Sequence, residues 1–135
     1  MSTVLFVCHQ NAGRSQMSQA LFTCAASGRH RALSAGTKPA DHVHPEVLEV
    51  MNEIGIDLSD RIPQLLTREL AEQADLVITM GCGDECPFIP GKRYIDCDLP
   101  DPSGQPIDHV RAIRDEIATR IEVLVAQLEA AASPS

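Results

Sequence analysis

A cysteine and an arginine near the start of the chain have the spacing of a loop that holds a tetrahedral oxyanion. Cys8 ends a short apolar run, a polar loop follows, and Arg14 and Ser15 stand just before a segment with helical periodicity. A thiol must ionise to act as a nucleophile, and loop amides at a helix N-terminus both favour the thiolate and bind an anion. A guanidinium adds a permanent charge whose planar fork pairs two oxyanion oxygens. The pattern therefore predicts nucleophilic chemistry on an oxyanion by Cys8, with Arg14 as the charged ligand.

The other loop residues are expected to shape this site. Asn11 can hold the loop by side-chain hydrogen bonds, and Gly13 allows backbone torsions that are closed to other residues. Ser15 can donate its hydroxyl to the sulfur. We assign oxyanion binding to the whole run after the cysteine: His9, Gln10, Asn11, Ala12, Gly13, Arg14 and Ser15. A buried strand-end cysteine followed by an ordinary polar turn is the alternative, but the order of strand, loop, glycine, Arg-Ser and helix favours the anion loop.

Length, charge and cysteine content limit the class of protein. A chain of 135 residues fits one domain, and we assign residues 1–131 to a single catalytic α/β domain and 132–135 to a frayed C-terminal tail. Eleven basic and nineteen acidic residues give a net charge of -8, which argues against nucleic-acid binding. No apolar run approaches about 18 residues and no signal segment is recognisable, so we expect a cytoplasmic protein without membrane association. Five cysteines in such a chain indicate redox, catalytic or metal-binding roles rather than structural disulfides.

Hydrophobic patterning predicts strands that alternate with helices. Four strands are expected, at residues 3–7, 30–35, 75–80 and 93–95. Helices are expected at residues 15–26 and 45–54, for a short stretch from Thr67, and at 107–130. This alternation predicts one open, parallel four-stranded sheet with helices on both faces. Ligands bind beyond the carboxyl ends of such strands, so we expect Cys8 and the loops after Met80 and Ile95 to meet at one edge.

The loop also resembles the phosphate-binding loop of the low-molecular-weight protein tyrosine phosphatase superfamily, and the resemblance covers essentially the whole chain. Its anchors are residues 8–15, the run Ser34-Ala35-Gly36-Thr37 and the pair Asp101-Pro102. Within that superfamily the chain is similar to the arsenate reductases. Three features indicate this: Gln16-Met17 where phosphatases usually have proline, Cys82 and Cys86 before Pro87, and Ser103-Gly104 where phosphatases place tyrosines.

The resemblance implies a cysteine-based reduction of arsenate. The Cys8 thiolate attacks arsenic, while Arg14 and the loop amides hold the oxygens. Asp101 protonates the departing oxygen, and Asp96 and Asp98 are alternatives because they are near in sequence. Asp101 is preferred, since the Asp-Pro pair matches the family motif.

Thiols are expected to supply the two electrons, by one of two routes. In the first, Cys82 attacks the Cys8 sulfur and releases arsenite, and Cys86 then forms a Cys82–Cys86 disulfide that thioredoxin reduces. In the second, glutathione or mycothiol, with a glutaredoxin-like protein, attacks the arsenylated Cys8 directly, and Cys86 is not catalytic. The spacer between Cys82 and Cys86 is shorter than in the usual thioredoxin-coupled members, so both routes stay open, with the internal relay preferred. We expect no bound cofactor, an external thiol reductant and a monomer.

Other functions are less favoured. A low-molecular-weight protein tyrosine phosphatase would share Cys8, Arg14 and Asp101 but would not need the extra cysteines. A phosphocysteine carrier of a sugar-transport system would have little use for the acid, and a non-catalytic oxyanion-binding protein would not need a reactive thiol. No metal is expected, because a structural zinc ion needs four ligands. Cys82 and Cys86 would supply two, and the sequence has no second pair of ligand residues with matching spacing.

The remaining polar residues of interest receive structural interpretations. Gln19 stands where potassium-binding relatives often have Glu, so no potassium site is expected. Cys24 falls on the apolar face of the first predicted helix and is expected in the core. Cys97 is expected to be a partly exposed bystander thiol, and His42 and His44 are expected to be solvated in a polar loop.

Overall fold

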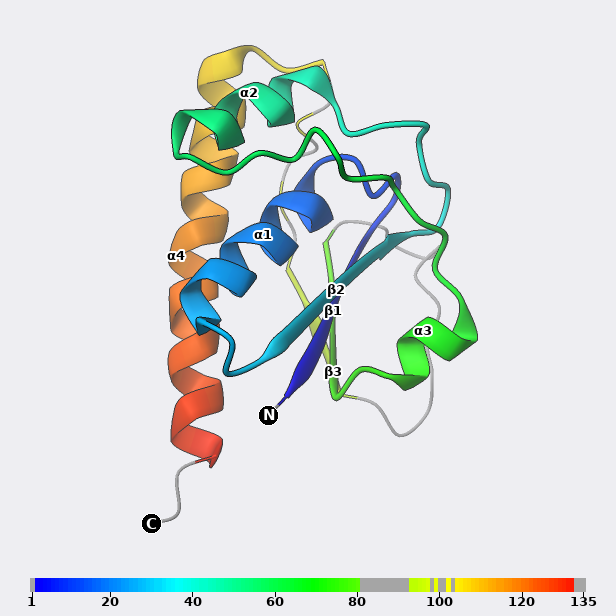
Figure 1. Ribbon diagram of the computed structural model, residues 1–135, viewed down its shortest axis with the longest axis vertical. Coiled ribbons are helices and arrows are strands. Elements are labelled where there is room, and N and C mark those ends of the chain that lie inside the picture. Colours follow the sequence, from blue (N-terminus) through cyan, green and yellow to red (C-terminus); the bar gives the residue numbers. More distant parts are fainter. Residues whose placement is uncertain (1, 81–92, 98, 100–101, 103, 133–135) are drawn as a thin grey trace.

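The chain folds around a parallel sheet with the expected number of strands. The computed structural model describes residues 2–80, 93–97, 99, 102 and 104–132. In this part of the chain the sheet has four strands in the order β2-β1-β3-β4. The strands are β1 (Thr3–Cys8), β2 (Arg31–Gly36), β3 (Leu76–Thr79) and β4 (Arg93–Asp96), and every pair is parallel (Figure 1). The predicted fold class is confirmed.

The register brings the carboxyl ends of the strands to one edge. Cys8 is opposite Gly36 on β2, and Val7 is opposite Thr79 on β3. Thr79 is in turn opposite Asp96 on β4. The segments that follow all four strands therefore start at the same edge, where the expected site lies.

Helices cover both faces of the sheet. They are α1 (Arg14–Ala26), α2 (Pro45–Glu53), α3 (Arg68–Glu72) and α4 (Ile107–Ala132). α1 packs along α4, and α2 lies across the end of that pair, whereas α3 lies on the opposite face (Figure 1). None of the helices in the described part of the chain is long and apolar enough to cross a membrane.

β1 is buried on both faces, which explains its uninterrupted apolar sequence. Val4, Phe6 and Cys8 belong to the core shared with α1, α2 and α4. Leu5 and Val7 belong to the smaller core beneath α3. Alternate side chains of a strand point to opposite faces, so a central parallel strand needs apolar residues at every position.

The helix ends that were predicted from local residues are also confirmed. The Thr67 side chain accepts a hydrogen bond from the Leu70 amide at 3.1 Å and caps α3, as predicted. Pro45 occupies the first turn of α2, and Gly55 follows that helix with φ of 81°.

The expectation that Cys24 packs in the core is wrong, because this thiol is exposed. α1 faces the interior through Ser18, Phe22 and Ala26, which are four residues apart and share one side of the helix. Two residues from Phe22, Cys24 lies on the opposite side. The sequence pattern placed the buried face wrongly because one of the residues that define it is a serine.

Candidate active site

The Cys8 sulfur lies at the end of β1, buried against the first turn of α1. Its Sγ atom is 2.8 Å from the Ser15 hydroxyl. The Asn11 amide nitrogen donates to that same hydroxyl oxygen at 2.7 Å. The hydroxyl still has a hydrogen to donate and a second lone pair, so either Ser15 or a Cys8 thiol can be the donor in this contact. When the cysteine acts as a thiolate nucleophile, its sulfur can only accept, and the Ser15 hydroxyl is then the donor.

Asn11 holds the loop in an unusual conformation. Its φ of 52° is in the left-handed region, and its side chain is fully buried. Its Oδ1 atom accepts from the backbone amide of Gln64 at 2.9 Å and from the Gln16 amide at 3.2 Å. The Gln16 Nε2 atom also donates to the Asn11 carbonyl at 3.1 Å. These bonds hold a backbone conformation that costs about 1–2 kcal/mol for a residue other than glycine.

The end of β2 presses against the back of the loop. A Cβ atom on Gly36 would lie 2.8 Å from both the Asn11 nitrogen and the His9 carbonyl oxygen. The next residues follow the loop, with Lys38 donating to the His9 carbonyl at 2.8 Å. Glycine is required at position 36 because any side chain would displace the loop.

Arg14 opens α1 and is almost fully buried. Its Nη1 atom donates to the Leu99 carbonyl at 3.0 Å. A Cβ atom on Gly13 would lie 2.7 Å from Cγ of Pro102. Leu99 and Pro102 therefore contact the residues at the start of α1, while Asp101, like Cys82 and Cys86, lies outside the described residues.

Glycine at position 13 also has a packing reason. Its φ of -139° and ψ of -95° belong to neither a helix nor a strand, and the close approach of Pro102 excludes a side chain there. The left-handed residue of the loop is Asn11.

A small cradle opens above the sulfur. Its described lining consists of Cys8, Gln10, Gly13, Arg14 and His44, and its cavity of about 10 Å³ is about the size of one water-sized probe. The Oε1 atom of Gln10 is buried and has no hydrogen-bond partner among the described residues. A tetrahedral anion in this cradle would contact the sulfur and the guanidinium together.

The electrostatics of the cradle favour an anion although the protein is acidic. The first turn of α1 contains no acidic side chain, so the helix N-terminus keeps its partial positive charge. The permanent charge of Arg14 adds to it. A net charge of -8 is therefore compatible with a locally positive binding site.

His44 is the residue of this site that sequence reasoning missed. It is half-buried and lines the cradle, whereas His42 is exposed as expected. The only sequence signal for His44 was its place directly before Pro45, at the start of a predicted helix.

The structure brings the predicted loop residues together in two layers. Gln10, Gly13 and Arg14 line the cradle, and Asn11 and Ser15 brace it from below. His9 is half-exposed, with its Nδ1 atom 3.4 Å from the Thr37 hydroxyl, and the Ala12 carbonyl accepts from the His44 amide at 3.0 Å.

Gln19 takes part in a hydrogen-bonded pair. Its Oε1 atom accepts from the Ser34 hydroxyl at 2.6 Å, and its amide nitrogen donates to the Ala32 carbonyl at 3.2 Å. Within the described ranges, no three His, Cys, Asp or Glu side chains are grouped to hold a metal ion.

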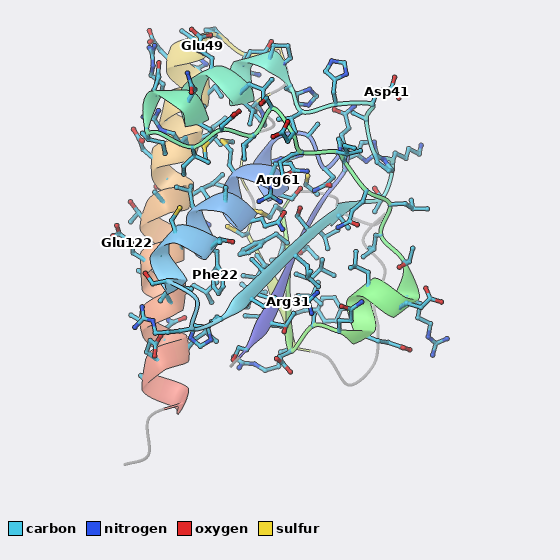
Figure 2. The ribbon with its side chains drawn as sticks, in the orientation of Figure 1. Phe22, Arg31, Asp41, Glu49, Arg61 and Glu122 are labelled. Carbon is cyan, nitrogen blue, oxygen red and sulfur yellow. The ribbon has the colours of Figure 1, made fainter. Side chains whose placement is uncertain are left out.

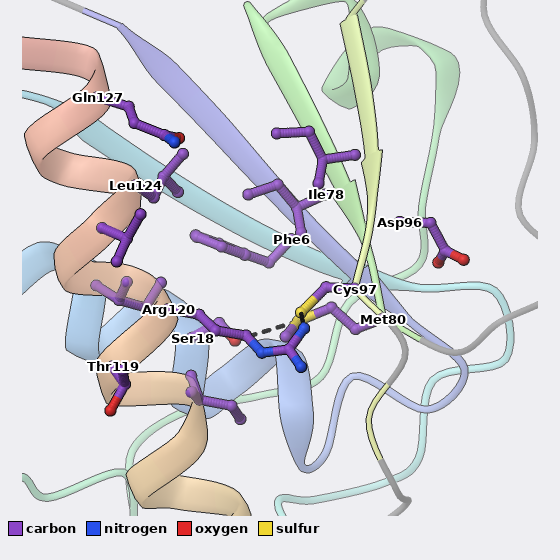
Figure 3. A pocket seen from close by; sticks show the side chains of 14 residues that line it. Phe6, Ser18, Ile78, Met80, Asp96, Cys97, Thr119, Arg120, Leu124 and Gln127 are labelled. Carbon is purple, nitrogen blue, oxygen red and sulfur yellow. Dashed lines mark hydrogen bonds between the residues drawn. The ribbon is translucent and has the colours of Figure 1, made fainter. Parts of the chain in front are cut away.

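A larger cavity lies elsewhere, between α4 and the sheet (Figure 3). It has a volume of about 290 Å³ and mostly apolar walls, and neither Cys8 nor Arg14 lines it. Cys97 borders it and is buried, so the expectation of a partly exposed thiol is wrong. The Arg120 Nη1 atom donates to the Cys97 sulfur at 3.0 Å. The pKa of Arg120 is raised, first by its hydrogen bond with Glu116 and then by that with Cys97.

Comparisons with known proteins agree with this geometry. The family model described as "Low molecular weight phosphotyrosine protein phosphatase" matches residues 3–133. A Halobacterium salinarum protein named "Putative arsenate reductase" is 46% identical over 121 residues, which cover 86% of this chain and 85% of that protein. The "Glutaredoxin arsenate reductase" of Synechocystis is 32% identical over 131 residues, covering 95% of this chain and 99% of the relative.

A solved structure shares the fold at similar sequence identity. It is the thioredoxin-dependent arsenate reductase of Corynebacterium glutamicum, with a TM-score of 0.84 and 41% identity. The match covers 97% of this chain, but this chain spans only 63% of that longer one.

Proposed function

The chain belongs to the low molecular weight phosphotyrosine protein phosphatase family, and we propose that within it the chain acts as an arsenate reductase. The observation that carries the proposal is the cradle, in which the Cys8 sulfur, the Arg14 guanidinium and the α1 N-terminus converge. Arsenate is tetrahedral and anionic, so it fits a site built for phosphate. The relatives named as arsenate reductases support this substrate.

In the first step the Cys8 thiolate attacks arsenic. A sulfur–arsenic bond forms, one arsenic–oxygen bond breaks, and the oxygen leaves as water after it takes up protons. Arg14 and the loop amides bind the other oxygens and stabilise the charge that builds up on them. Ser15 keeps its donor on the sulfur until the attack.

Asp101 is the proposed proton donor for the departing oxygen. Its support comes from its neighbours in the chain, since Leu99 accepts from Arg14 and Pro102 packs against Gly13. A carboxylic acid can supply such a proton when it lies within hydrogen-bond reach of the leaving oxygen.

In the second step thiols reduce arsenic. Cys82 attacks the Cys8 sulfur, a disulfide forms, and the electron pair of the sulfur–arsenic bond stays on arsenic, which leaves as arsenite. Cys86 then attacks Cys82, restores the Cys8 thiolate and leaves a Cys82–Cys86 disulfide for an external dithiol. Support comes from the end of β3. The amide of Met80, two residues before Cys82, donates to the carbonyl of Val7 at 2.7 Å, and Val7 directly precedes Cys8.

The external reductant is a thiol, and the two routes make different use of Cys86. In the direct route, glutathione or mycothiol attacks arsenylated Cys8, and a glutaredoxin-like protein completes the cycle. The Corynebacterium relative is named thioredoxin-dependent and the Synechocystis relative a glutaredoxin arsenate reductase. We favour the internal relay with thioredoxin, in the cytoplasm, where thiols stay reduced.

The test is to trap the intermediates without external reductant. Reduced protein is incubated with arsenate and its disulfides are mapped by mass spectrometry, beside Cys86→Ser and, as the matched control, Cys24→Ser. We expect a Cys82–Cys86 disulfide in the parent and in the control, and a Cys8–Cys82 disulfide in Cys86→Ser. No disulfide anywhere, with turnover only on addition of a small thiol, would replace the relay by the direct route. Thiols left untouched by arsenate under all conditions would overturn the reductase.

Phosphatase activity is the second candidate function, because Cys8 and Arg14 suit phosphate as well as arsenate and the family model is described as a phosphotyrosine phosphatase. Hydrolysis needs Cys8, Arg14 and an acid but no second thiol. In the Cys82→Ser variant, a phosphatase keeps its turnover of a phosphate ester, whereas arsenate reduction by the relay stops.

A further inference from the structure

His44 reaches the oxyanion cradle from outside the catalytic loop. The four other described lining residues all belong to residues 8–14, whereas His44 follows β2 and immediately precedes α2. Its Cδ2 atom would lie 3.5 Å from a Cβ atom on Gly13, so the imidazole covers the glycine of the loop. His44 is therefore distant in sequence from residues 8–14 but forms part of the wall of the same cradle.

The backbone on both sides of His44 fixes this place. Its amide donates to the Ala12 carbonyl at 3.0 Å. Its own carbonyl accepts from the Val47 and Leu48 amides at 3.0 and 3.1 Å, in the first turn of α2. Pro45 further restricts the backbone of the residue before it. These contacts therefore fix the backbone from which the side chain reaches the cradle, and they do not use the ring itself.

The ring nitrogens are available for a ligand. Among the described residues, none forms a hydrogen bond with the imidazole of His44, although the residue is half-buried. A neutral imidazole offers one N–H donor and a protonated one offers two. Each oxygen of an oxyanion can accept more than one hydrogen bond, so a further donor at the wall would add to its binding.

We propose that His44 is a binding residue that donates a ring hydrogen bond to an oxygen of the bound oxyanion. This inference rests on the proposed function for its substrate, arsenate. The binding step itself is tested with inorganic phosphate, which has the same tetrahedral shape and needs no turnover.

Side-chain variants separate this role from a structural one. Any residue at position 44 keeps the backbone bond to Ala12, so a purely structural histidine predicts unchanged anion binding in a folded variant. His44→Ala removes the donor, and His44→Gln keeps an amide donor at a similar reach. His42→Ala is the matched control, because His42 is an exposed histidine two residues away and does not line the cradle.

The first measurement is the dissociation constant for inorganic phosphate, by isothermal titration calorimetry. We expect about a tenfold weaker constant for His44→Ala, the typical loss of one hydrogen bond to a charged group. His44→Gln should stay within about threefold of the parent, and His42→Ala should match the parent. An unchanged constant in His44→Ala, or an equal loss in His42→Ala, would overturn the proposal.

The second measurement is arsenate reduction by the same variants with excess reductant. A binding residue raises KM about tenfold in His44→Ala and leaves kcat within about threefold. An unchanged KM would count against His44 as a ligand of arsenate. The two proposals can fail separately. If the parent protein reduces no arsenate, but His44→Ala still binds phosphate more weakly than the parent, the proposed function is refuted and the binding role of His44 remains supported.

Discussion

The two halves of α1 bury different kinds of side chain. The half nearest the cradle buries mainly polar side chains, namely Arg14, Ser15, Gln16 and Ser18, with Met17 as the apolar member. The distant half buries only apolar ones, namely Ala20, Phe22 and Ala26. Both halves belong to one unbroken helix, and both face the interior. Burial in this helix therefore serves a binding site at one end and the packed core at the other.

The polar half is buried because it has hydrogen-bond partners. Ser15 is bonded to Cys8 and Asn11, and Ser18 donates to the Arg14 carbonyl at 2.8 Å. In the apolar half, the Phe22 ring packs edge-on to Phe6 with centroids 5.8 Å apart. Figure 2 shows Phe22 within the molecule, while Glu49 and Glu122 lie on its outside. Side chains of the first half that contact Cys8 or line the cradle are expected to set activity, and those in the second half to set stability.

Phe22→Ala tests the apolar half and has the largest expected effect. Loss of a fully buried ring should lower the free energy of unfolding by about 3–5 kcal/mol, because the cavity cannot collapse completely. Urea denaturation measures this change. At temperatures where the variant is folded, its phosphate affinity should be within about twofold of the parent, and a tenfold loss would show that the halves are not separable.

Arg14→Lys tests the polar half. A lysine keeps the charge but loses the planar fork, so kcat/KM for arsenate should fall by about 100- to 1000-fold. Initial rates give the change, and a thermal melt checks that the fold is intact. A rate within tenfold of the parent would mean that charge alone is sufficient at this position.

Ser15→Ala should have an intermediate effect on both properties. Its removal takes the donor from the Cys8 sulfur and leaves the Asn11 amide without its acceptor. We expect kcat/KM to fall by about 10- to 100-fold and stability by about 1–3 kcal/mol. Ser18→Ala is the matched control, because it removes another buried hydroxyl of the same half without touching the sulfur. A similar rate loss in the control would refute a specific role for Ser15.

Cys24→Ser should have the smallest effect. The thiol is exposed on the apolar half, so the free energy of unfolding should change by less than about 0.5 kcal/mol. Chemical denaturation of this variant beside Phe22→Ala compares two positions that are two residues apart. A large destabilisation would mean that the assigned buried face of α1 is wrong.

Local signals in the sequence were sufficient for the sheet, the helix ends and the position of the loop between Cys8 and Arg14. The apolar run of β1 and the cap at Thr67 depend on residues close in sequence, and so does the spacing from Cys8 to Arg14. Periodicity failed for Cys24 because a functional helix end buries polar residues, which such patterns count as exposed.

Long-range packing decided the rest of the candidate site. Gln64 and His44 reach the loop only because the chain after β2 folds back over it. No local pattern reports such a contact. Cys97 was likewise misjudged because its burial depends on Arg120 of α4, 23 residues away in sequence.

Gly36 has a consequence for anyone who would move this site to another scaffold. It has no side chain that could take part in a reaction, yet the absence of a Cβ atom leaves the space in which the loop backbone lies against β2. A graft of residues 8–15 onto a foreign parallel sheet would transfer the nucleophile without the surface that shapes its loop. The smallest transferable unit is therefore two adjacent strands, with glycine at the end of the second, and a library that randomises only the loop would miss the position on which its geometry depends.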